Sequence, residues 1–105
     1  MSDFNINVST QFSKFPAGRY RTDGKNSGQR FREEFLAPAI KNNEFNKVII
    51  NFDGVLMGGS SFLEESFGGL VREEKIDANT IINKIVIVAK SATLKEQILS
   101  YIKNA

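Results

Sequence analysis

The sequence predicts an α/β fold with a four-stranded mixed sheet, largely parallel, and about three to four helices. Residues 48–50 and 85–89 are short runs rich in β-branched side chains, as expected of strands that are covered on both faces. Apolar residues at helical spacing follow each run. Strands that alternate with helices in this way indicate βαβ units, in which right-handed crossovers join parallel strands.

The N-terminal part of the chain predicts two strands and a helix. Residues 4–8 alternate apolar and polar side chains, which is typical of a strand with one face on the core. A turn signal at residues 16–18 predicts a short second strand at residues 19–21, and this pair would add an antiparallel edge to the sheet. A helix is expected to begin near residues 26–27. Because proline removes an N–H donor, Pro38 should kink this helix or end its first part.

The middle of the chain reads as a strand, a glycine-rich turn at Gly58-Gly59, and a helix. Ser61 and Glu64 have the spacing of a capping box, so Ser61 is expected at the start of that helix. Gly68-Gly69 then lies inside the helix, where each glycine costs about 1 kcal/mol relative to alanine. We expect a close approach between this helix and the sheet as the compensation.

The C-terminal part predicts a linking turn, a strand and a final helix. Residues 77–80 are polar and small enough for the turn, and the strand at residues 85–89 follows. Thr93 and Glu96 have the spacing of a second capping box, and apolar residues recur at helical spacing after them.

The composition indicates one globular domain, residues 1–105, with 41% hydrophobic and 25% charged residues. Cysteine and histidine are absent, which excludes disulfides, thiol nucleophiles and imidazole acid–base chemistry. We therefore expect no enzymatic activity, no cofactor and no metal. No apolar run approaches the roughly 20 residues that span a membrane, and the N-terminus has no signal-peptide pattern. A cytoplasmic location without membrane association is the expectation.

The charge is unevenly distributed along the chain. The formal net charge is +2, but residues 14–32 hold six cationic side chains against one carboxylate, a net charge of +5. Of these cations, Arg19, Arg21, Lys25, Arg30 and Arg32 are the candidates for binding an anion. A nucleotide or a nucleic acid would suit such a segment. A polar loop that is simply solvated explains the same charges equally well.

The order of the elements and the stretch from Asn51 to Leu70 resemble a known family. They are similar to the bacterial STAS-like domains of unknown function, which are relatives of the STAS domains of anti-sigma factor antagonists. The likeness extends over nearly the whole chain and includes Gly18-Arg19 and residues 27–33. It implies a STAS-like fold and a small regulatory domain that binds a protein partner, with an ATPase-type kinase or another regulatory protein as the expected class.

The resemblance also implies where that partner would bind. In the antagonists, a serine in the turn before a helix is phosphorylated by a partner kinase. Ser60 and Ser61 fall at that place, and Ser61 is the better match. Gly59 stands where the antagonists have an aspartate, and Phe62 stands where they have a glycine. The partner surface implied in this way comprises Gly58, Gly59 and Glu65 together with the two serines. Read from local physics alone, Ser61 is a helix cap.

Overall fold

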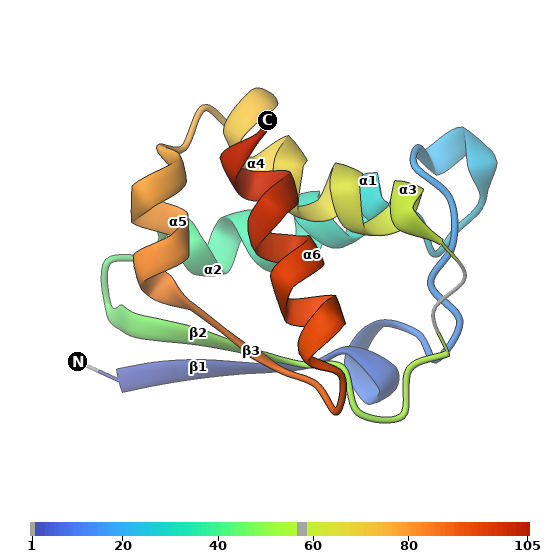
Figure 1. The fold of residues 1–105 in the computed structure, drawn as a ribbon, viewed down its shortest axis with the longest axis horizontal. Helices are drawn as coiled ribbons and strands as arrows, with labels where there is room; N and C mark the ends of the chain where they lie inside the picture. Colours follow the sequence, from blue (N-terminus) through green and yellow to red (C-terminus); the bar gives the residue numbers. More distant parts are fainter. Residues whose placement is uncertain (1, 57–58) are drawn as a thin grey trace.

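The computed structural model describes residues 2–56 and 59–105. Its three strands, β1 (Ser2–Asn7), β2 (Phe45–Asn51) and β3 (Ile85–Val88), form one parallel sheet in the order β1-β2-β3. Figure 1 shows this sheet with the helices packed against it. The α/β class is therefore confirmed, whereas the fourth strand is not found in the described part of the chain. None of the described helices is long and apolar enough to cross a membrane.

The segment predicted as a second strand forms a loop and a 3-10 turn. Tyr20 precedes the turn η2 (Arg21–Asp23). The Asp23 carboxylate accepts hydrogen bonds from the backbone N–H groups of Arg19 and Tyr20, at 3.2 and 2.9 Å. These N–H groups are then not free to join a sheet ladder. The expected antiparallel edge is wrong for this reason, and every strand pair in the described structure is parallel.

The helices cover one face of the sheet only. Val48 and Ile50 of β2 are fully buried, but Ile49 between them is half-buried, and Val86 of β3 is exposed. The expectation that these strands are covered on both faces is therefore wrong. The strand order explains it, because right-handed crossovers between strands that follow one another in order put both connections on the same side.

A helical run that spans residues 28–41 connects β1 to β2. It comprises α1 (Gly28–Phe31), the π-helical turn η3 (Arg32–Leu36) and α2 (Ala37–Lys41). Ser27 caps its start, and the Ser27 hydroxyl accepts from the Arg30 N–H at 3.2 Å. Pro38 lies in the first turn of α2, where a missing N–H is tolerated, and the wider turn η3 precedes it. The predicted start is thus found. The helix does not end near Leu36 as predicted, because Leu36 and Ala37 both keep helical backbone angles and the run continues through Pro38.

A second run, residues 60–72, follows β2 and comprises α3 (Ser60–Leu63), the π-helical turn η4 (Glu64–Gly68) and α4 (Gly69–Arg72). The predicted capping box is wrong, because Gly59 is the N-cap residue and no side chain caps this end. The glycines here approach other helices rather than the sheet. A Cβ on Gly69 would collide with the Arg32 guanidinium, and a Cβ on Gly68 would lie 3.3 Å from the Tyr101 carbonyl oxygen of the last helix.

The last two helices are α5 (Ala78–Lys84) and α6 (Ala92–Lys103). Asp77, predicted within a linking turn, caps α5, and its carboxylate accepts from the Thr80 N–H at 3.2 Å. The second predicted capping box is also wrong, because α6 begins after Ser91 and no side chain caps it. Another short π-helical turn, η1 (Val8–Phe12), follows β1 directly.

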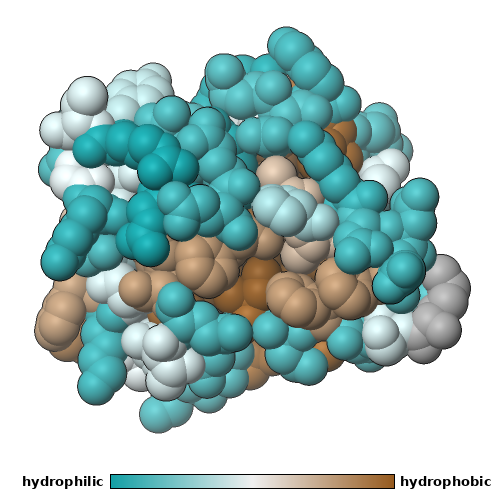
Figure 2. Space-filling view, turned by 180° about the vertical axis from the view of Figure 1, so that it is seen from behind, coloured by the Kyte–Doolittle hydropathy of each residue, from teal (hydrophilic) through white to brown (hydrophobic). Residues whose placement is uncertain are grey.

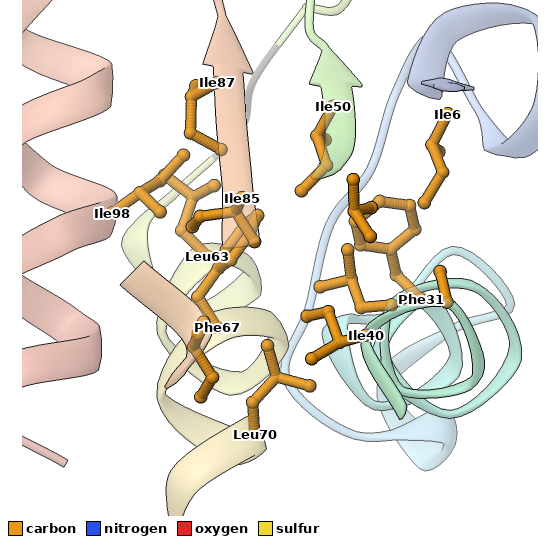
Figure 3. Close-up of a cluster of buried hydrophobic side chains, with 14 of the residues drawn as sticks. Ile6, Phe31, Ile40, Ile50, Leu63, Phe67, Leu70, Ile85, Ile87 and Ile98 are labelled. Carbon is orange, nitrogen blue, oxygen red and sulfur yellow. The ribbon is translucent and has the colours of Figure 1, made fainter. Parts of the chain in front are cut away.

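One hydrophobic core lies between the sheet and the helices. Figure 3 shows side chains from β1, β2 and β3 meeting those of the two helical runs and of α6. Three phenylalanines are fully buried in it: Phe31, Phe62 and Phe67. Phe12 from η1 packs against Phe31 with ring centroids 4.9 Å apart, so the segment after β1 is joined to the same core.

Candidate functional site

The loops that follow the three strands lie at the same end of the sheet, the end formed by the carboxyl ends of the strands, because the strands are parallel (Figure 1). Two of them are joined directly, because the Leu56 N–H donates to the Lys14 carbonyl at 2.7 Å. Gly54 adopts a φ of +84° in the turn that leaves β2, as a type II turn requires at that position. The strand order does not reverse, so the sheet lacks the crevice at which open α/β sheets usually bind ligands.

Large apolar side chains are exposed on these loops. Leu56 is 65% exposed and Phe15 is 62% exposed. Leu56 donates the hydrogen bond that joins the two loops, and Phe15 directly follows its acceptor, Lys14. A hollow of about 330 Å³ lies beside Leu56, and Asp53, Lys90 and Leu94 are among the residues that line it. We call Phe15, Leu56, Ser60 and Ser61 the loop surface.

Both candidate serines are accessible. Ser60 and Ser61 are exposed and form the first turn of α3. Neither hydroxyl takes part in a side-chain cap, so the role that local physics assigned to Ser61 is not filled. Gly59 is exposed as well, whereas Gly58 lies outside the described residues. Ser60, Ser61 and Gly59 thus lie together at the beginning of α3.

Glu65 does not lie on this surface. Its side chain is only 4% exposed and belongs to an ionic cluster between the two helical runs. The members of this arginine–glutamate cluster are Arg19, Arg32, Arg72, Glu64, Glu65 and Glu74. Lys41 joins it at the surface, where Lys41 Nζ lies 2.9 Å from Glu74 Oε1.

The pair of Arg32 and Glu65 is the buried centre of the cluster. Each side chain is 4% exposed, and Arg32 Nη1 donates to the Glu65 carboxylate and, at 3.1 Å, to the Glu65 carbonyl. Arg32 Nε reaches Glu74 Oε2 at 3.2 Å. Arg19 and Arg72 each approach Glu65 Oε1 at 3.2 Å from the more exposed side. No buried side-chain polar atom in the described residues lacks a partner, which a buried ion pair needs to be tolerated.

Glu64 joins the cluster to the basic loop. Arg72 binds its carboxylate through two nitrogens, at 2.8 and 3.1 Å, and Arg19 binds it from the other side. The hydrogen bonds from Arg72, and then those from Arg19, lower the pKa of Glu64 although partial burial opposes this. The same carboxylate raises the pKa of Arg19. Glu64 therefore anchors the loop instead of capping a helix.

The other arginines of the basic segment are also paired. Arg21 contacts Glu33 and Glu34 at 3.0 and 3.2 Å, and Arg30 contacts Glu34 at 3.3 Å. Lys25 is exposed and has no carboxylate within ion-pair distance in the described part of the chain. The net charge of +5 is thus largely compensated by carboxylates from later in the chain, and the structure does not assemble the five predicted anion-binding residues around one point.

The fold and the exposed loops define a small parallel α/β domain. Comparison with protein families finds a match to the STAS-like domain of unknown function (DUF4325) over residues 27–95. The chain belongs to this family. The match does not include Gly18-Arg19, so the likeness is confirmed for less of the chain than predicted. No curated protein and no solved structure matches the chain.

Sequence reasoning missed the cluster, although one signal for it was present. Gly69 lies inside a helical run, where glycine is unfavourable, and Gly28 is the first residue of α1. A Cβ on Gly28 would lie 2.5 Å from the Phe62 carbonyl oxygen, and one on Gly69 would collide with Arg32. Gly28 therefore indicates where the two helical runs touch, and Gly69 indicates where the Arg32 side chain packs between them.

Proposed function

We propose that this chain is a regulatory domain that binds a protein partner through the loop surface and has no catalytic activity of its own. The observation that carries the proposal is the exposure of Leu56 and Phe15 on adjoining loops. Exposed apolar side chains that lie close together on a soluble protein often mark an interaction site, and the hydrogen bond from Leu56 to Lys14 places these two on neighbouring segments.

The size of the expected effect follows from the area involved. Burying one leucine or phenylalanine side chain that was exposed contributes roughly 1.5–3 kcal/mol. Loss of Leu56 alone should then weaken a complex by about tenfold to a hundredfold, since each 1.4 kcal/mol is tenfold in the dissociation constant. Both side chains lie on segments held in place by the loop–loop hydrogen bond and by Arg19, so little ordering is needed on binding.

The finer proposal is that the partner is an ATPase-type kinase and that it phosphorylates Ser61. Its support is the exposure of Ser61 at the start of α3, together with membership of the family. A phosphate next to the apolar loop surface would oppose the burial of Leu56, because a dianion is expensive to desolvate. Phosphorylation would thus release the partner.

The test is affinity capture from cells that produce the chain, with wild type and Leu56→Ser as parallel baits. We expect at least one protein that wild type retains stoichiometrically and Leu56→Ser loses. Val86→Ser is the matched control, because it also removes an exposed apolar side chain but lies on the sheet, away from the loops. A partner lost equally from both variants, or from neither, contradicts the assignment to the loop surface.

Ser61→Asp and Ser61→Ala separate the finer proposal from the coarser one. The aspartate variant should lose the partner and the alanine variant should keep it. Equal retention by the two, with loss in Leu56→Ser, would leave the loop surface in place and refute the serine switch.

A further inference from the structure

A second hollow lies beside β1, which is one edge of the sheet. Its volume is about 400 Å³, within the range of roughly 300–1,000 Å³ that is usual for ligand sites. Most of its lining is apolar. We call this the β1 groove and define it by Phe4, Ile6, Phe35, Pro38, Ala39 and Phe45. Figure 2 shows an apolar band between polar surface above and below, hollowed at its centre.

The backbone of β1 is open along the groove. The Asn7 N–H donates to the Gln11 side chain and not to β2, so it points away from the sheet. Alternate residues of a strand direct their backbone groups to the same side, and the N–H and C=O of Asn5 therefore also point outward. Conversely, the Ser2 N–H points inward, to the Glu44 carbonyl at 3.3 Å. In the described structure β1 pairs with β2 alone.

We propose that an extended segment of another protein binds here as an added strand. Its backbone pairs with the open edge at Asn5, and its alternate side chains enter the β1 groove. Addition of a strand combines backbone hydrogen bonds, which supply affinity, with a side-chain groove, which supplies selectivity. This site is separate from the loop surface, because none of the residues that define the loop surface lines the β1 groove.

The groove favours a separate peptide over a second copy of this chain. In a β1–β1 pair, the second strand would present the side chains of its own Phe4 and Ile6. Ile6 is already 1% exposed within its own core and cannot be shared. Only Phe4, which is half-buried and stacked on Phe45 at 4.6 Å, remains to fill the hollow. The apolar side chains of a separate peptide, by contrast, are not buried in a core of their own and can fill the hollow.

The charges around the groove indicate the composition of the peptide. Glu34 lines the groove, and Glu44 lies exposed just before β2. Glu34 is shared with Arg21 and Arg30, but no cation of the described residues lies within ion-pair distance of Glu44. No lysine or arginine lines the groove. We therefore expect apolar residues at alternate positions, flanked by lysine or arginine.

The test uses random linear peptides displayed on phage and selected against the immobilised chain. An enriched peptide is then synthesised with a fluorescent label, and its binding is measured by anisotropy. The expected consensus has apolar residues at positions i and i+2 and a basic residue outside them. Absence of any enriched sequence, or a consensus without this alternation, overturns the proposal.

Two variants tie the labelled peptide to the groove. Asn5→Pro removes the outward N–H, and edge strands accept proline where that N–H faces solvent. Pro38→Glu puts a charge into the groove at an exposed helical position, and glutamate is a better helix former than proline there. Each should weaken binding by about tenfold or more, since a lost hydrogen bond or a buried unpaired charge reaches that size.

Val86→Glu is the matched control. It also exchanges an exposed apolar residue for glutamate, but on β3 at the far edge. Circular dichroism and the urea midpoint check that all variants are folded. Unchanged binding in Asn5→Pro and Pro38→Glu overturns the proposal, as does loss in Leu56→Ser, which would place the peptide on the loop surface. Self-association that Asn5→Pro abolishes would make a second copy the occupant and refute the assignment to a peptide.

Discussion

Removal of Arg32 should destabilise the fold more than any surface change, because it leaves two carboxylates without their buried partner. In Arg32→Met, Glu65 keeps Arg19 and Arg72 at 3.2 Å, and Glu74 keeps Lys41 at 2.9 Å. The Glu65 carboxylate nevertheless remains 4% exposed with its closest cation gone. Breaking one side of a buried ion pair costs about 3–5 kcal/mol.

This loss is large compared with the whole stability of the domain. A chain of 105 residues has a free energy of unfolding of about 5–15 kcal/mol. With a urea m-value of about 1.5 kcal/mol/M, the midpoint should fall by roughly 2–3 M. Urea unfolding followed by circular dichroism at low temperature measures it directly.

The double variant Arg32→Met with Glu65→Met is the decisive comparison. Replacing both charges by apolar side chains of similar length removes the unpaired group, so the double variant should be more stable than Arg32→Met alone. Single variants within 1 kcal/mol of wild type, or losses that simply add, would refute the reasoning that the pair is a coupled buried unit.

Two further predictions concern helix contact and pH. Gly28→Ala should destabilise the domain by about 1–3 kcal/mol, since its Cβ would lie 2.5 Å from the Phe62 carbonyl oxygen and the two helices must separate; a thermal midpoint equal to that of wild type contradicts this. The pKa of Glu64 is lowered in the folded state by Arg72 and Arg19, so its contribution is fully present above the unfolded value of about 4.3 and is lost as the pH falls through the folded value. Glu64→Gln should therefore be less stable than wild type near pH 7, and the difference in urea midpoint should shrink on acidification; a difference that does not change with pH would exclude the ion pairs as its cause.

The strands and the main helices could be predicted because their signals are local. Runs of β-branched residues predict β2 and β3, and the alternation of apolar and polar side chains predicts β1. The polar residues around Ser27 predict the start of α1. Residues 19–21 show the limit of that approach, because three residues cannot distinguish a strand from a turn. The small polar residues around Asp77 predict a turn, but an aspartate before an apolar helical pattern is equally typical of a helix cap. The structure shows that Asp77 caps α5.

The charges could not be assigned from sequence, because their partners lie far along the chain. Glu64 had the spacing of a capping partner, but two arginines outcompete the local backbone for its carboxylate. In the same way, the basic segment predicts free cations, but Arg32 is paired with Glu65 and Glu74, which lie more than thirty positions later in the chain. Local spacing predicts what a side chain is able to do, and the tertiary fold decides which partner it takes.

The parallel sheet also determines the order in which the domain can assemble on the ribosome. β1 is synthesised first, but Phe4 pairs with Val48, 44 positions later, and Val48 pairs with Ile85. The helical run of residues 28–41 needs only its own neighbours and can form early. Until β2 has left the exit tunnel, β1 has no strand to pair with, and its Phe4 and Ile6 side chains have no sheet to join. β1, an edge strand of the finished sheet, is thus made first and waits for β2, and it is during this interval that chaperones would have most to protect.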